Sequence, residues 1–161
     1  MKSICNIKFI FLRKFTFFYY LIRTEVIMLV DKIRAKKIII LDLEERLFIP
    51  FLQPIKKELD NMHVPISYFI STRYIGDVAF ELLKIPKNRH FPIEISKKLH
   101  LTDIYLSAHI HGSGYKKSIK VNVSHNQPVK WLLPPKNCFV NYDCHFLTGQ
   151  LNREQVEQAI R

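Results

Sequence analysis

A histidine and a lysine five positions apart are the residues of this chain best suited to chemistry. His125 and Lys130 follow a β-branched run at 118–123 that is typical of a strand. An imidazole exchanges protons near neutral pH, and an ammonium stabilises charge on phosphate. The pair predicts a phosphate or proton-transfer site, with Asn126 and Gln127 as further contacts. The alternative is an ordinary loop, with the histidine bonded to a carbonyl group and the lysine solvated.

A second polar loop follows the strand-like run at 102–108. Two glycines in it let the backbone approach a phosphate closely, although the third glycine of a dinucleotide fingerprint and the ending of a P-loop are missing. His109 and His111 have no nearby carboxylate or cysteine to complete a metal site, so we expect no metal. The candidate phosphate contacts are His111, Gly112, Ser113 and Gly114.

The order of apolar runs predicts one α/β domain with a Rossmann-like, mostly parallel sheet and flanking helices. Alternating strands and helices are typical of such sheets, and their ligands bind at the carboxyl ends of the strands. The two polar loops should therefore meet at one edge. Strands are expected at 36–43, 63–70, 102–108, 118–123 and 142–149, and helices at 47–59, 74–84, 93–99 and from 152 onward.

Two prolines interrupt the first of these helices. Pro50 and Pro54 fall within an amphipathic pattern that includes Leu47 and Leu59. Each proline removes a backbone donor, so the helix should either begin near Pro50, as a first-turn residue, or bend. Pro86 should end the next helix.

Residues 1–30 form an aromatic and basic segment ahead of the α/β domain at 36–161. Their longest uncharged run, 15–22, is too short to cross a bilayer. Scattered basic residues and the lack of a small-residue cleavage site argue against a signal peptide. Three interpretations stay open: a segment in a membrane interface, a helix packed on the domain, or an extension upstream of a start at Met28.

The chain of 161 residues carries 25 Lys and Arg against 14 Asp and Glu, a formal charge of +11. This excess favours anionic partners. Nucleic acid is the least favoured of them, because the cations do not cluster on one helix and no binding motif appears. The odd number of cysteines without metal-ligand spacing indicates a reducing, cytoplasmic location, with peripheral attachment to the inner face of the membrane as an option. We expect Cys144 to be buried.

Three stretches, 125–131, 142–143 and 148–155, resemble the N-terminal half of the CDP-glycerol glycerophosphotransferase family, whose members are GT-B-type transferases. The similarity covers about residues 36–161. In that family a strand ends in His-Gly, followed by a turn with Pro and then Lys. The resemblance implies that His125 is the acceptor-side base or a phosphate ligand, and Lys130 matches the following lysine. Asn126 stands where the family usually has glycine, which limits backbone access to phosphate more than it affects the fold.

The resemblance also implies a function for the whole domain. Family members hold a CDP-linked donor in a second, C-terminal Rossmann-like domain and react in the cleft between the two. This chain would be the acceptor-side half, truncated at its C-terminus and inactive without a donor domain from a second chain. It would take a phosphorylated or polyol-type acceptor for a teichoic-acid or other surface polymer, with no cofactor. The alternatives are a non-enzymatic module that binds anions or a membrane surface, and a remnant without activity.

Overall fold

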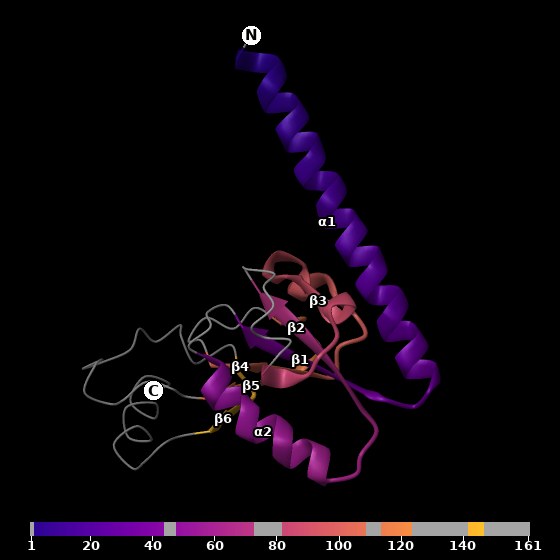
Figure 1. Cartoon of the computed structure of the whole chain (residues 1–161), viewed down its shortest axis with the longest axis vertical. Helices are drawn as coiled ribbons and strands as arrows, with labels where there is room; N and C mark the ends of the chain where they lie inside the picture. The colour runs from indigo at the N-terminus through magenta and orange to yellow at the C-terminus, as the bar shows by residue number, and fades with distance from the viewer. Residues whose placement is uncertain (1, 44–47, 73–81, 109–113, 124–141, 147–161) are drawn as a thin grey trace, which may run out of the picture.

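The computed structural model describes the chain except for residues 1, 44–47, 73–81, 109–113, 124–141 and 147–161, and describes side chains from residue 14 onward. Helices alternate with short strands along most of it (Figure 1). The elements in order are α1 (Lys2–Ile33), β1 (Lys37–Leu43), α2 (Ile49–Asn61), β2 (Ile66–Thr72), the 3-10 helix η2 (Lys87–Arg89), β3 (His90–Pro92), the 3-10 helix η3 (Ile93–Lys98), β4 (Ile104–Ser107), β5 (Ile119–Val123) and β6 (Cys144–Phe146).

The strands form a six-stranded sheet in the order β3-β2-β1-β4-β5-β6, and all its pairings are parallel. This is the strand order of the Rossmann fold. The predicted α/β class, with a parallel sheet and flanking helices, is confirmed. β1, β4 and β5 lie within the predicted strand ranges, whereas β2 begins at Ile66, three residues later than expected, and β3 was not predicted.

The central strand β1 is buried on both faces, as its continuous apolar run predicts. Leu41 and its alternate neighbours face α2, where Leu52 completes the contact. Ile38 and Ile40 face the opposite side, beneath α1 and η3. The sheet therefore carries two apolar cores, one on each face.

Helix α2 begins at Ile49 with Pro50 in its first turn, which confirms that prediction. Pro54 lies inside the helix, where its missing N–H removes one backbone hydrogen bond. The helix expected at 74–84 falls mostly outside the described residues, but Leu82 and Leu83 are helical and Lys84 follows them.

A non-glycine residue with positive φ follows α1, α2 and the helical residues Leu82 and Leu83. These residues are Ala35, His63 and Lys84, with φ values of 56°, 55° and 55°. Such left-handed residues close helix ends, usually as glycine. After α1 the amide of Ala35 donates to the Lys32 carbonyl, and the amide of Lys36 donates to the Asp31 carbonyl. These bonds satisfy carbonyl groups that the helix end leaves open.

Helix α1 packs over β1 and β3, on the same face of the sheet as η3. Its N-terminal part projects beyond the strands (Figure 1). Met28 is fully buried against this face, and Tyr20 and Leu21 pack at its margin. The second half of α1 thus packs on the domain, and the helix runs to Ile33.

Polar contacts fix the same half of α1. The guanidinium of Arg23 donates to the His90 carbonyl at 2.7 Å, and Lys32 forms an ion pair with Asp103. Asp31, 2% exposed, accepts bonds of 2.7 Å from Ser67 and Arg89. A buried carboxylate needs such partners, since losing its hydration is costly.

Removing the Asp31 carboxylate should cost much more than removing an exposed one. We expect Asp31→Ala to lower the free energy of unfolding by about 3 kcal/mol, because Arg89 is left without its buried partner. Asp60→Ala is the matched control: Asp60 is 47% exposed and pairs with Lys56 on α2, so its loss should cost less than about 1 kcal/mol. Urea unfolding followed by circular dichroism measures both.

This difference should depend on pH in one direction. Burial alone would raise the pKa of Asp31, but hydrogen bonds from Arg89 and Ser67, with the charges of Arg89 and Lys36, hold it below its usual value of 3.8. A carboxyl group with a lowered folded-state pKa contributes stability above its unfolded pKa and loses it as the pH falls through the folded value. The gap between wild type and Asp31→Ala should shrink below about pH 4. An unchanged gap there would contradict this account.

Candidate carboxyl-edge site

The strand order reverses between β1 and β4, and this point defines the candidate site. From β1 the chain moves outward through β2 to β3, then returns to place β4 on the other side of β1. Ligands of open parallel sheets bind at such a switch point, outside the carboxyl ends of the strands.

A row of polar residues crosses five strands at this edge. Asp42 of β1 is in register with Ser71 of β2 and with Ser107 of β4, and Ser107 is in register with Asn122 of β5. Asn122 in turn is paired with His145 of β6. Residues in register on neighbouring strands face the same side of a sheet. We call Ser71, Asp42, Ser107 and Asn122 the carboxyl-edge row; all four are buried.

Hydrogen bonds hold the centre of this row. The Tyr105 hydroxyl donates to Asp42 Oδ2 at 2.7 Å, and the Ser107 hydroxyl donates to the same oxygen at 2.9 Å. The side-chain amide Nδ2 of Asn122 donates to the Ser107 backbone carbonyl at 3.5 Å. These contacts fix the orientation of the carboxylate at the switch point.

Ser71 adds a further hydroxyl group to the row. Its Oγ is buried and has no hydrogen-bond partner among the described residues. Burying a hydroxyl without a hydrogen-bond partner lowers the stability of the fold, so such groups usually bind water or a ligand. The row therefore combines one carboxylate with hydroxyl and amide groups that donate and accept hydrogen bonds.

Most of the residues expected from the sequence to form the site lie outside the described residues. This holds for the loop that follows β5 and for most of the loop that follows β4. The residues concerned are His109, His111, Gly112, Ser113, His125, Asn126, Gln127 and Lys130. Their assignment to catalysis or phosphate binding stays a prediction.

Gly114 is the expected site residue that the structure does describe. It is buried against the ring of Tyr105, and a Cβ at this position would lie 2.5 Å from Tyr105 Cγ. The glycine is thus required for close packing on a residue that bonds to Asp42. Its contact with a phosphate stays a prediction.

The carboxyl-edge row was missed from the sequence. Asp42, Ser71 and Ser107 are single polar residues near the ends of apolar runs, and their spacing along the chain carries no motif. A usable signal was present: a charged residue inside a strand buried on both faces needs partners, and Asp42 occupies such a place.

The described side chains also bear on metals and thiols. Among them, no group of three or more His, Cys, Asp or Glu residues is placed to hold a metal ion. Cys144, expected to be buried, is exposed on the edge strand β6. The prediction was wrong because it considered only the alternation along the strand, and an edge strand has a neighbour on one side.

Comparison with known proteins adds no identification. No family model, curated protein or solved structure matches the chain. The fold class therefore rests on the observed strand order, and the function on the chemistry of the site.

Adding a methyl group at Gly114 should disturb the support of the row. We expect Gly114→Ala to lower the free energy of unfolding by about 1–3 kcal/mol, because Tyr105 must shift in a packed core. Lys116→Ala, in the exposed turn two residues later, is the control and should change it by less than about 0.5 kcal/mol. Thermal unfolding measures both, and equal stability of Gly114→Ala and wild type would refute the close contact.

Proposed function

We propose that this chain is the acceptor-side half of a transferase of the phosphoglycerol or sugar type, and that a polyol group of the acceptor binds at the carboxyl-edge row. The observation that carries the proposal is the oriented carboxylate of Asp42 at the switch point of a parallel sheet. Support from the sequence comes from the resemblance of the segments around His125 and 148–155 to the CDP-glycerol glycerophosphotransferase family.

The chemistry of the row suits a polyol better than a phosphate. A carboxylate accepts up to about four hydrogen bonds, so Asp42 can accept from ligand hydroxyls as well as from Tyr105 and Ser107. A phosphate dianion beside the same buried carboxylate would be repelled. The phosphate of the acceptor would therefore bind outside the row.

The catalytic base would be His125. It follows Val123, the last residue of β5, by two positions in the sequence. The neighbouring strand β4 contributes Ser107 to the row. His125 would take a proton from the acceptor hydroxyl, while Lys130 stabilises charge on the transferred phosphate. The donor would come from a second, CDP-binding domain, and the product would be a surface polymer made at the inner face of the membrane.

Binding and transfer test this proposal separately. Calorimetric titration with glycerol, a polyol without a phosphoryl group, should give a Kd about tenfold higher for Ser107→Ala than for wild type, since one buried hydrogen bond is lost. Ser96→Ala is the control, because Ser96 is a buried serine of η3 outside the row. Equal affinity of wild type, Ser107→Ala and Ser96→Ala would show that the row is not part of the acceptor site.

Transfer is followed as CMP release from CDP-glycerol after a CDP-binding partner domain is added. We expect His125→Ala to slow release by about 10²-fold or more, as loss of a general base does. Unchanged release in this variant, or none with wild type, would refute the transferase assignment while leaving the binding result intact.

A second candidate function, attachment to an anionic membrane surface, is favoured by the outward face of α1. Large, exposed apolar side chains line this face. They are Phe15, Phe18, Tyr19, Ile22, Val26, Leu29, Val30 and Ile33. Apolar surface of this extent on a helix is typical of helices that lie in a membrane interface. Within the described part of the chain, no helix has the length and apolar character needed to cross a bilayer.

Charge complementarity indicates an anionic bilayer as the occupant of this face. The acidic residues of α1 turn toward the domain, where Glu25 accepts from the His100 amide and Asp31 binds Arg89. Lys14 and Arg34 are exposed at either end of the apolar face. A second copy of the chain would bring another +11 charge against it.

Vesicle binding tests the membrane assignment. We expect Ile22→Glu to reduce the fraction bound to phosphatidylglycerol vesicles about tenfold, since the bilayer would no longer bury a large apolar side chain at this position. Met62→Glu is matched, because Met62 and Ile22 are 64% and 62% exposed. Equal loss in both variants, or equal binding to phosphatidylcholine, would contradict the assignment. A dimer in sedimentation that Ile22→Glu converts to monomer would assign the face to a second copy instead.

A further inference from the structure

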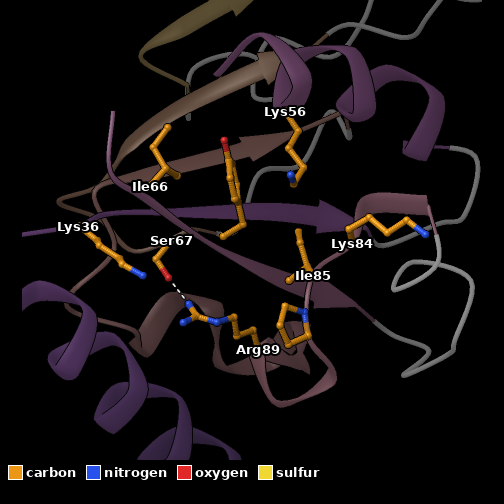
Figure 2. Close-up of a pocket in the computed structure, with 9 residues that line it drawn as sticks. Lys36, Lys56, Ile66, Ser67, Lys84, Ile85 and Arg89 are labelled. Atoms are coloured by element: carbon orange, nitrogen blue, oxygen red, sulfur yellow. Dashed lines mark hydrogen bonds between the residues drawn. The ribbon is translucent and has the colours of Figure 1, made fainter. Parts of the chain in front are cut away.

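A pocket of about 170 Å³ opens at the amino ends of β1 and β2, at the edge of the sheet opposite the carboxyl-edge row. It lies where the residue before β1, helix α2 and the segment 84–89 meet (Figure 2). Ser67 of β2 is separated from Ser71 of the row by four residues, or about 13 Å along the strand. The pocket is therefore distinct from the candidate acceptor site. We call its cations, Lys36, Lys56, Lys84 and Arg89, the amino-edge cations.

Carboxylates balance the amino-edge cations only in part. Asp31 pairs with Arg89 and lies 3.7 Å from the ammonium of Lys36, and Asp60 pairs with Lys56. Lys84 forms no ion pair among the described residues. Four cations against two carboxylates leave an excess of two positive charges around one small pocket.

Donor groups remain for an anion in this pocket. The contacts of Arg89 to Asp31 and Ser67 both use Nη1. Its Nη2 and Nε belong to the same rigid, planar guanidinium and are further donors. Lys36 Nζ is beyond hydrogen-bond distance of Asp31. Figure 2 shows Lys36 and Lys56 directed toward the space above Arg89, while the flexible side chain of Lys84 extends outward at the rim.

Tyr68 supplies a neutral donor beside these cations. Burial raises its pKa above the usual value, and the nearby Asp60 carboxylate raises it further, so the phenol stays protonated. The ammonium of Lys56 lies 4.6 Å from the centre of the Tyr68 ring, which keeps this lysine at the pocket.

The structural role of Arg89 does not account for the whole arrangement. Its bond to Asp31 holds η2 to α1, and this contact needs neither Lys36 nor Lys84. Like charges gathered around one pocket repel each other, and a bound anion relieves that repulsion. Phosphate matches the geometry best, because it accepts from a planar guanidinium and from several ammonium groups together.

We propose that the amino-edge pocket binds the phosphoryl group of a small soluble phosphate ester, with Arg89 and Lys36 as its main ligands and Lys84 at its rim. The size of the pocket favours a single phosphoryl group over a polymer. This site is independent of the transferase proposal, because it uses no residue of the carboxyl-edge row.

Calorimetric titration with inorganic phosphate at constant ionic strength tests the pocket. The double variant Lys36→Gln/Lys84→Gln should raise the Kd for phosphate about tenfold or more, since charge-assisted hydrogen bonds are lost. The control is Lys37→Gln/Lys57→Gln, which removes the same charge from exposed lysines outside the pocket and should change the Kd less than about twofold. All four positions are on the surface, so the variants should fold.

Each other outcome overturns the proposal in a defined way. An equal loss in both double variants would show general attraction to a basic protein, and no binding heat with wild type would exclude the site. Binding of phosphatidic acid vesicles, but not of inorganic phosphate, that only the pocket variant loses would assign the pocket to a lipid headgroup. Ser107→Ala should leave phosphate affinity unchanged, which separates this result from failure of the acceptor site.

Discussion

A buried carboxylate joins parts of this molecule that lie far apart in the sequence. Asp31 of α1 binds Ser67 of β2 and Arg89 of η2, across 36 and 58 positions of the chain. An unpaired charge at this depth would cost several kcal/mol, so the three elements are stable only together. The contact also sets the rotation of α1. Because Asp31 and Met28 point inward, the opposite side of the helix must face outward with its apolar residues.

The predictable parts of the fold are those whose burial is indicated by the local pattern of apolar residues. β1 and β4 are largely apolar runs because a parallel sheet covers both faces of its inner strands, whereas β5 alternates apolar residues with Lys120 and Asn122. β3 has only three residues, ends in Pro92 and exists through pairing with β2, so its own sequence carries no strand pattern. Local sequence also could not decide among the three interpretations of the N-terminal segment. Its partners, such as His90 and Asp103, are distant in sequence.

The candidate sites show the same limit. Sequence reasoning placed function in loops with histidine and glycine, where residue types signal chemistry directly. The carboxyl-edge row instead depends on register: Asp42 and Ser107 meet because β4 aligns with β1, and no local pattern encodes that alignment. The amino-edge cations come from three separate segments, so they appear in the sequence only as part of a general positive charge. The two edges differ in chemistry, with hydroxyls and a carboxylate at one and cations at the other.

The contacts that fix α1 have a consequence for synthesis of the chain. Its bonds from Arg23, Lys32 and Glu25 reach residues 67, 71 and 75 positions later. At about 5–20 residues per second, a ribosome needs roughly 3–15 s to add that length. For those seconds the α1 segment has been synthesised, but the residues that will cover its inner face have not. Until they follow, both sides of this segment lack their partners, and folding later covers only one of them.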